Sequence, residues 1–303
     1  MSTLLRGIKE YPVDISAVVT VCDDGKSTGR LRKEFNTPAV GDVRRVLIAL
    51  SETEPLVETL FNYRFETSSD LNGHTVGNLL LTAIQDIAGN MSDGVEALGR
   101  ILNLKGKVLP LTEDGKITLM GKMKDGAIIE GEHNITAYNS PIEEVFYKEM
   151  PKVNETVIKE IKQADMIVLS MGSLYTSIIP TLICPEIIEA IDKSNAKIMY
   201  ACNMMTQPGE TDGFKVSDHI QVLNEYLGKR KIDIVIGNDG KIEKSIIKKY
   251  ARLEEKDPVI FDKAKVKKMV PEVLFTDLVC ISEGCVRSNP TKLAFHIFSY
   301  LID

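Results

Sequence analysis

The chain has 303 residues, of which 44% are hydrophobic and 26% are charged, and this ordinary balance argues against a disordered protein. Its net charge of −6, without a long basic block, argues against binding to nucleic acid or to an anionic membrane surface. Five cysteines without a CxxC pair favour reduced thiols, and neither a signal-peptide pattern nor an apolar segment near the ~18 residues of a membrane span is present, so we expect a cytoplasmic protein without membrane insertion.

The first third of the chain, residues 1–105, begins with a buried strand and continues with helices. The apolar, β-branched run at 17–21 predicts the strand. Apolar residues at helical spacing predict helices at 42–50, 55–65 and 75–87.

Residues 106–148 differ from the rest of the chain in their pattern of apolar and turn-forming residues. Short apolar runs at 108–109, 117–120 and 127–129 alternate with Asp114-Gly115 and Asp125-Gly126. Asp-Gly between apolar runs is typical of a β-hairpin. We therefore expect a small antiparallel insertion or lid at 106–148, within a single domain that covers 1–303.

The carboxyl half returns to strands that alternate with helices. Strands are predicted at 166–169, 198–201 and 232–236, and helices at 154–163, 185–192, 216–227, 241–250 and 290–301. This alternation predicts an α/β fold with a mainly parallel sheet. Each predicted strand ends in a small polar loop, and ligands of open α/β sheets bind at the carboxyl ends of the strands.

The most informative of these loops follows the first strand and reads Asp23-Asp24-Gly25-Lys26-Ser27-Thr28-Gly29. Small residues let backbone N–H groups approach an anion, and paired carboxylates can hold a divalent cation. The alternative is a helix amino terminus, in which Ser27 or Thr28 caps backbone N–H groups. These residues alone leave both interpretations open.

Four further motifs could join this loop. Gly41-Asp42 precedes a helix, and the carboxylate could equally be a helix cap. In the motif 73–78, His74 and Asn78 stand at the start of another helix, although His74 could also be a packed residue without chemistry. Gly172 and Ser173 follow a strand like a phosphate-cradling turn, and the long polar loop at 202–213 favours function over simple connection.

The chain as a whole closely resembles the YvcK-like gluconeogenesis factors, which are related to the CofD 2-phospho-lactate transferases. The resemblance rests, in this order, on VTVCDDGKSTGRLRKEF, GDVRR, NYRF, GHTVGNLLL, LNLKGKVLP, GSLYTSIIP and CNMMTQPGETDGF. It implies a Rossmann-like sheet with helices on both faces that binds a nucleotide sugar, typically UDP-N-acetylglucosamine. It also implies a role that links carbon metabolism to cell-wall synthesis and cell shape.

The resemblance further implies a set of site residues. Phosphate contacts would come from the first loop and the second motif, with Mg²⁺ on their three aspartates in the transferase relatives. Arg287 would neutralise a diphosphate, a role that suits its planar, two-pronged donor. The full set is Asp23, Asp24, Ser27, Thr28, Asp42, His74, Asn78, Gly172, Ser173, Thr176, Asn203, Thr206 and Arg287.

The chain departs from the family pattern at its start. Family members begin with an apolar strand and a Gly-Gly-Gly-Thr-Gly loop, and Met1 stands just after that point. We expect the DNA upstream of Met1 to encode both. Smaller departures are Lys26 where Gly is usual, Arg45 where Asn is usual, and Ser170-Met171 where Gly-Pro is usual.

These observations predict a nucleotide-sugar-binding regulatory protein without turnover, because no nucleophile and base stand in a recognisable catalytic motif. The expected partners are the nucleotide sugar and a regulatory target in cell-wall precursor synthesis, and a homodimer is the default oligomer. The alternative is a Mg²⁺-dependent transferase of the CofD type that acts on a diphosphate-linked donor. The loop at 204–213 argues against it.

Overall fold

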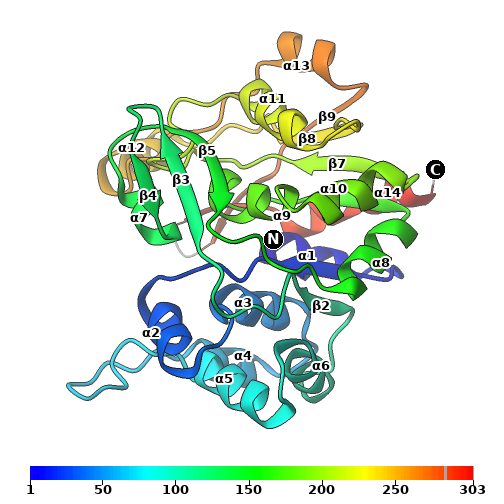
Figure 1. The fold of residues 1–303 in the computed structure, drawn as a ribbon. Coiled ribbons are helices and arrows are strands. Elements are labelled where there is room, and N and C mark those ends of the chain that lie inside the picture. The colour runs from blue at the N-terminus through cyan, green and yellow to red at the C-terminus, as the bar shows by residue number, and fades with distance from the viewer. Residues whose placement is uncertain (283–284, 303) are drawn as a thin grey trace.

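Two parallel sheets lie at the centre of the computed structural model, which describes residues 1–282 and 285–302 (Figure 1). In the smaller sheet, β1 (Ser16–Val19) pairs with β2 (Lys107–Pro110). In the larger one, β6 (Met166–Leu169), β7 (Lys197–Ala201), β8 (Ile234–Asn238) and β9 (Glu272–Thr276) pair in that order. All pairs in both sheets are parallel, so the carboxyl ends of the strands in each sheet lie along one edge.

The two inner strands of the larger sheet, β7 and β8, are deeply buried. Side chains at 198–200 of β7 and 234–236 of β8 are fully inaccessible to solvent. Such continuous apolar runs are typical of strands that are covered by helices on both faces. β6, by contrast, keeps three half-buried residues, Met166, Ile167 and Val168.

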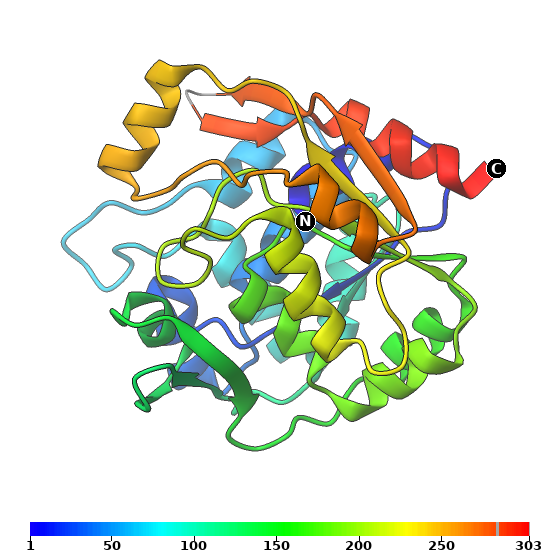
Figure 2. The same cartoon turned by 90° about the horizontal axis from the view of Figure 1, so that it is seen from above.

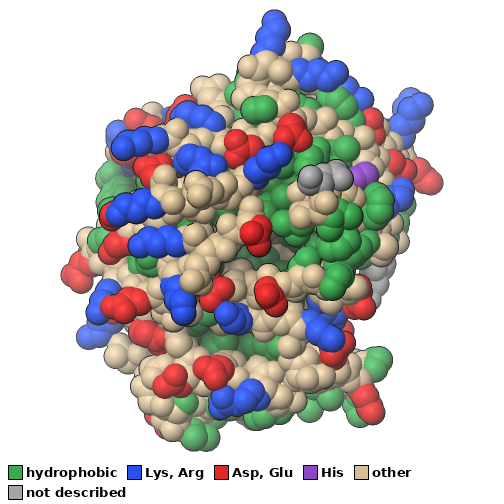
Figure 3. Space-filling view, turned by 90° about the vertical axis from the view of Figure 1, so that its right-hand side faces the viewer, with side chains coloured by type: hydrophobic (Ala, Val, Ile, Leu, Met, Phe, Trp, Pro, Cys, Tyr) green, Lys and Arg blue, Asp and Glu red, His purple; other side chains and the backbone are tan. Residues whose placement is uncertain are grey.

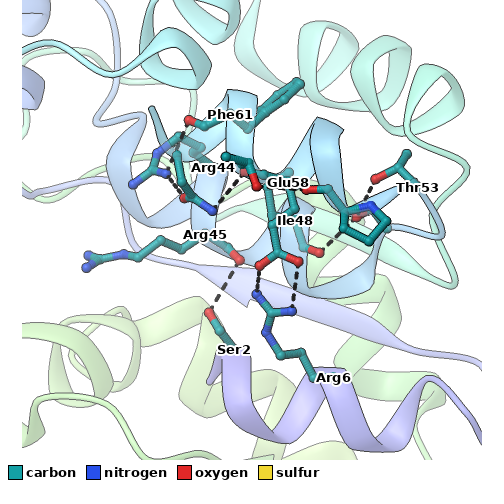
Figure 4. Close-up of polar contacts among 12 residues, drawn as sticks. Ser2, Arg6, Arg44, Arg45, Ile48, Thr53, Glu58 and Phe61 are labelled. Atoms are coloured by element: carbon teal, nitrogen blue, oxygen red, sulfur yellow. Dashed lines mark hydrogen bonds and ion pairs between the residues drawn. The ribbon is translucent and has the colours of Figure 1, made fainter. Parts of the chain in front are cut away.

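Helices of the amino-terminal half surround the smaller sheet. They are α1 (Ser2–Ile8), α2 (Lys26–Phe35), α3 (Gly41–Leu50), α4 (Pro55–Asn62), α5 (Val76–Ala88) and α6 (Met91–Ile101). Local sequence defines the ends of α5: the Thr75 hydroxyl accepts a hydrogen bond from Asn78 N at 3.3 Å, and Gly89 ends the helix with φ of 87°. Helix α1 is tied to this half through an Arg6–Glu58 ion pair with α4 (Figure 4).

Helices of the carboxyl-terminal half cover the larger sheet (Figure 2). They are α8 (Glu155–Gln163), η1 (Leu174–Ile178), α9 (Ile179–Leu182), α10 (Pro185–Lys193), α11 (Val216–Tyr226), α12 (Lys244–Leu253), α13 (Lys263–Met269) and α14 (Pro290–Ile302). The last of them, α14, packs against α1. The two termini of the chain are therefore joined through helix packing.

Antiparallel strands form two smaller units. Strand β3 (Leu119–Met123) lies between β4 (Ile128–Glu130) and β5 (Ile142–Tyr147), and α7 (Glu132–Ala137) connects the last two. Strands β10 (Val279–Ser282) and β11 (Cys285–Ser288) form a hairpin before α14.

The predicted α/β fold with a mainly parallel sheet and small antiparallel elements is confirmed. One strand was assigned to the wrong partner: the run at 108–109 was grouped with the hairpins, but it forms parallel β2. Its hydrogen bonds run from Lys107 N to Ile15 O at 2.7 Å and from Leu111 N to Val19 O at 2.9 Å. The predicted helix at 55–65 ends at Asn62, because the following residues instead bond to the 74–76 segment.

Within the described ranges, no single helix is long and apolar enough to cross a membrane. One pair of consecutive segments, Leu174–Leu182 and Pro185–Lys193, reaches that length only together and is bent by 69°.

Candidate functional site

A cavity of about 1750 Å³ lies between the two parallel sheets. Its walls include residues 16–20 along β1 and 166–170 along β6. At the carboxyl ends of these strands the lining becomes polar. We call residues 20–28, which follow β1, the first exit, and residues 170–176, which follow β6, the second exit.

Glycines allow the first exit to pack closely against the start of α3. A Cβ atom on Gly41 would lie 2.7 Å from Thr28 Oγ1 and 2.9 Å from Asp23 Oδ2, so a larger residue would clash there. The other oxygen of Asp23 accepts a hydrogen bond from Gly25 N at 2.9 Å. The N-cap residues of α2 and α3, Gly25 and Val40, provide no side-chain capping hydrogen bond in the part of the chain that the structure describes, and both helix starts line the cavity.

A buried network of polar side chains stabilises the first exit. Ser27 Oγ lies 2.9 Å from His74 Nδ1 and accepts a hydrogen bond from Asn78 Nδ2 at 3.2 Å. Burial and the nearby charge of Arg30 lower the pKa of His74.

Arg44 completes this network. Its Nε donates to Asn78 Oδ1 at 2.9 Å, and its Nη1 donates to the carbonyl of Phe61 and to Asn62 (Figure 4). Burial lowers the pKa of Arg44 to about 10, and the neighbouring Arg45 adds to the effect. Arg44 therefore positions Asn78 and the α4 end.

In addition to the buried Arg44, two exposed arginines lie on the cavity wall. Arg45, in the first turns of α3, forms an ion pair with Asp42 of the same helix. Arg287, on β11, lines the cavity and is exposed. These two side chains can reach an anion in the cavity without first leaving a buried hydrogen bond.

The β3–β5 insertion contacts the first exit through α7. Asp24 Oδ1 accepts a hydrogen bond from His133 N at 2.9 Å. The carboxyl of Glu132 lines the cavity near Asp23, and burial together with the charges of Asp23 and Asp42 raises its pKa to about 8. Near neutral pH, Glu132 therefore adds no full negative charge to this wall.

The second exit is already occupied by a carboxylate of the same chain. Glu210 is 5% exposed, and it accepts hydrogen bonds from Ser173 Oγ at 2.6 Å, Thr176 Oγ1 at 3.3 Å and Tyr175 N at 3.2 Å. These are the donors that the sequence assigned to a phosphate. The turn predicted to cradle a phosphate is thus filled by Glu210.

The polar loop after β7 uses its predicted contact residues internally. Asn203 Nδ2 donates to Gly172 O at 2.9 Å, which ties the loop to the second exit. Thr206 exchanges hydrogen bonds with Asp257, donating its N–H at 2.8 Å and accepting from Asp257 N at 2.9 Å. Neither side chain lines the cavity.

The structure thus divides the predicted site residues into two groups. The cavity is lined by Asp23, Ser27, Thr28, Asp42, Asn78, Gly172, Ser173 and Arg287, but not by Asp24, His74, Thr176, Asn203 and Thr206. Sequence reasoning missed three contributors, Arg44, Glu132 and Glu210. Of these, Glu210 stands inside the polar loop at 202–213, which was its only signal.

The three aspartates proposed for Mg²⁺ do not form one metal site. Asp24 is bound to the α7 backbone and Asp42 to Arg45. Within residues 1–282 and 285–302, no group of three or more His, Cys, Asp or Glu side chains is arranged to hold a metal ion.

This fold and cavity have known relatives. Residues 1–279 match the family described as 2-phospho-L-lactate transferase CofD. The chain belongs to the CofD family. Members of the family named gluconeogenesis factor include proteins of Halalkalibacterium halodurans, 43% identical over 97% of this chain and 91% of the relative, and of Bacillus subtilis, 43% identical over 100% and 94%. The predicted resemblance is therefore confirmed.

A crystal structure at 2.60 Å resolution of a UPF0052 family protein from Bacillus halodurans has the same fold as this CofD-family chain. The TM-score is 0.93 at 43% identity, over 98% of this chain and 95% of the other.

Proposed function

We propose that this CofD-family protein binds a nucleotide-diphosphate sugar of the UDP-N-acetylglucosamine type, as a regulator without turnover. Binding would let it report on carbon metabolism to cell-wall synthesis, and thus to cell shape. The relatives named gluconeogenesis factor support a metabolic role. The cavity supports the ligand class.

One observation carries the proposal: two helix starts and two exposed arginines line the same cavity. The starts of α2 and α3 direct backbone N–H groups and the positive ends of the helix dipoles toward a bound anion. Arg45 and Arg287 add charge-assisted donors. A diphosphate matches this arrangement because its oxygens can accept from both arginines, whereas a neutral sugar alone carries no charge to attract them.

Ser27 and His74 are the pair of polar side chains that most resembles a nucleophile and a base, and their burial supports binding over turnover. Ser27 and His74 are hydrogen-bonded, but Ser27 is only 3% exposed and also accepts from Asn78. A nucleophile must reach its substrate. Here the hydroxyl stabilises the wall of the cavity.

Calorimetry with UDP-N-acetylglucosamine tests the proposal, with GDP as the competing nucleotide and with and without Mg²⁺. We expect saturable binding that weakens by at least about tenfold in Arg287→Ala, roughly the loss of one charge-assisted contact. Arg100→Ala, which removes an exposed arginine on α6, serves as the matched control and should bind normally. The proposal fails if UDP-N-acetylglucosamine does not bind to the chain.

The family match favours a second candidate, a CofD-type transferase. It predicts product from a nucleotide-activated phospholactate and a deazaflavin acceptor in the presence of Mg²⁺. Product formation would replace the regulatory proposal, and its absence alongside sugar-nucleotide binding would support it.

A further inference from the structure

A third exposed arginine, Arg64, lines the cavity besides Arg45 and Arg287. With the buried Arg44, four of the ten arginines of the chain lie on the cavity wall, whereas Lys107 is the only lysine there among the described residues. A guanidinium can bind the oxygens of a carboxylate or phosphate through two parallel hydrogen bonds, which an ammonium group cannot do. Arg64 is the arginine on this wall that neither the proposed diphosphate contacts nor the buried network uses.

Arg64 lies at the base of an arm, residues 63–75, that joins α4 to α5 and projects from the body of the molecule (Figure 1). Backbone hydrogen bonds close the base of the arm, from Phe65 N to His74 O at 2.9 Å and from Gly73 N to Phe65 O at 2.8 Å. Arg64 Nη1 donates to the carbonyl of Gly73. Since the next residue, His74, is hydrogen-bonded to the first exit, Arg64 lies on the cavity wall close to that exit.

The charge of Arg64 is not neutralised by a carboxylate. Its guanidinium forms no ion pair within the part of the chain that the structure describes, and the carbonyl of Gly73 occupies one of its five N–H donors. Its neighbours include other cations: burial lowers the pKa of Arg44 and of His74, and the positive charge of Arg64 adds to both effects. An unpaired cation on a cavity wall, near other cations, favours an anionic ligand.

The alternative role of Arg64 is to hold the arm in place. Arg30, on α2, already does so, because its Nη1 donates to Asp70 O at 3.3 Å and its Nη2 donates to Asn72 O. Arg30 is exposed and does not line the cavity. The two arginines therefore contact the arm in the same way, and they differ in their access to a ligand in the cavity.

The cavity can hold a ligand that carries more than a diphosphate. Its volume of about 1750 Å³ exceeds the ~300–1,000 Å³ of a typical ligand pocket. Along β1 and β6 the wall is mostly apolar, and hydrophobic side chains are visible inside the hollow between the two halves of the molecule (Figure 3). An ionised group is costly to bury against such a wall. A further anionic group of a ligand is therefore expected at the polar end, where Arg64 lies.

The ligand class proposed above indicates what this group is. The nucleoside is uncharged, and the two phosphates have contacts of their own at the helix starts, Arg45 and Arg287. The sugar is the remaining part that can carry a charge, and a planar carboxylate matches the planar donor of arginine. We propose that Arg64 binds a carboxylate on the sugar, so that the preferred ligand is a nucleotide-diphosphate sugar acid. This inference rests on the proposed function and names the substrate class more narrowly.

The test compares two ligands of equal size, UDP-glucuronate and UDP-glucose, which differ in a carboxylate in place of a hydroxymethyl group. Calorimetry measures the affinity for both, with UDP-N-acetylglucosamine as a third ligand. In the wild type we expect UDP-glucuronate to bind at least about tenfold more tightly than UDP-glucose, which corresponds to one charge-assisted contact. Arg64→Gln should remove this preference and leave the affinity for UDP-glucose within about twofold of the wild type.

Arg30→Gln is the matched control. It removes contacts to the arm of the same kind but leaves the cavity wall unchanged, so the preference for UDP-glucuronate should persist. Both residues are exposed, and both variants should melt at the wild-type temperature. Loss of the preference in both variants would assign the effect to the arm as a whole and would overturn the inference.

The remaining outcomes separate this inference from the proposed function. Equal binding of UDP-glucuronate and UDP-glucose by the wild type overturns the inference alone, provided that a UDP sugar binds. An equal loss of affinity for both ligands in Arg64→Gln would place Arg64 at the diphosphate and would also overturn it. If none of the three UDP sugars bound, the proposed function itself would fail, and the inference with it.

Discussion

The two exits resemble each other in sequence but differ in what already occupies them. The first exit, after β1, leads into α2 and packs against the start of α3, and among the described residues the N-cap residues of both helices lack a side-chain capping hydrogen bond. At the second exit, after β6, the hydroxyls of Ser173 and Thr176 and the N–H of Tyr175 bind Glu210. A small polar loop after a strand thus predicts an anion-binding turn, but the anion can belong to the protein itself.

The difference assigns separate roles to the two exits. In the proposed function, the external anion binds at the first exit, with Arg45 and Arg287 on the wall of the same cavity. The second exit holds the loop at 202–213 against the larger sheet through Glu210 and Asn203. We therefore expect substitutions at the second exit to change stability more than affinity.

Glu210→Ala should produce the largest change in stability. It leaves several buried donors without an acceptor, and hydrogen bonds to a charged group contribute about 1.5–3 kcal/mol each, so we expect a loss of about 3 kcal/mol in the free energy of unfolding. Urea denaturation measures it. Glu189→Ala, at an exposed ion pair on α10, is the control and should change stability by less than about 0.5 kcal/mol. A similarly small effect of Glu210→Ala would show that the second exit is not held by its carboxylate.

Ser27→Ala should produce a smaller loss, at the first exit. It removes the bond to His74 and leaves Asn78 Nδ2 without its acceptor, which corresponds to about 1–2 kcal/mol. The same denaturation experiment applies, with Ser245→Ala on exposed α12 as the control. If Ser27→Ala abolished a catalytic activity without changing stability, Ser27 would be a nucleophile and not a wall residue.

The pKa of Glu132 predicts a pH dependence at the first exit. Its folded pKa is raised to about 8 from a usual value near 4.5, so the folded state retains a proton that the unfolded chain releases. Stability from this group is therefore complete below about pH 4.5 and is lost as the pH rises toward 8. We expect a modest effect, because Glu132 is half-buried and solvent screens it.

The measurement is the free energy of unfolding between pH 5 and 8.5, in the wild type and in Glu132→Gln. The wild type should lose more stability over this range than the variant. Parallel pH profiles would contradict the raised pKa.

The Arg6–Glu58 pair, outside both exits, should give the smallest effect. Both side chains are substantially exposed, and such pairs typically contribute about 0.5 kcal/mol. A double-mutant cycle with Arg6→Ala and Glu58→Ala measures the coupling. A coupling above about 2 kcal/mol would mean that the ion pair between α1 and α4 contributes as much to stability as the hydrogen bonds at the two exits.

Sequence patterns predicted the parts of this fold that depend on local order. Buried strands such as β7 and β8 appear as continuous apolar runs, and helix starts such as that of α5 carry their own cap at Thr75. The partner of β2 was not predictable in this way, because a parallel pair joins residues about 90 positions apart and leaves no turn signal.

The candidate site was predictable to the same extent, because sequence patterns indicate local structure but not contacts between distant residues. Asp23 lies in the loop after β1, Thr28 and Asp42 lie in the first turns of α2 and α3, and all three line the cavity. Glu210 reaches the second exit from 37 residues downstream of Ser173. A residue type in a polar loop gives no sign of which distant donors it will contact.

Hydrogen exchange during titration with UDP-N-acetylglucosamine tests most directly whether the first exit is the one that binds the ligand. We expect exchange to slow several-fold at residues 24–30 and 41–46, and to remain unchanged at 173–178, where Glu210 keeps its hydrogen bonds. Slower exchange at 173–178 with none at 24–30 would show that the ligand displaces Glu210 and that the roles of the two exits are reversed.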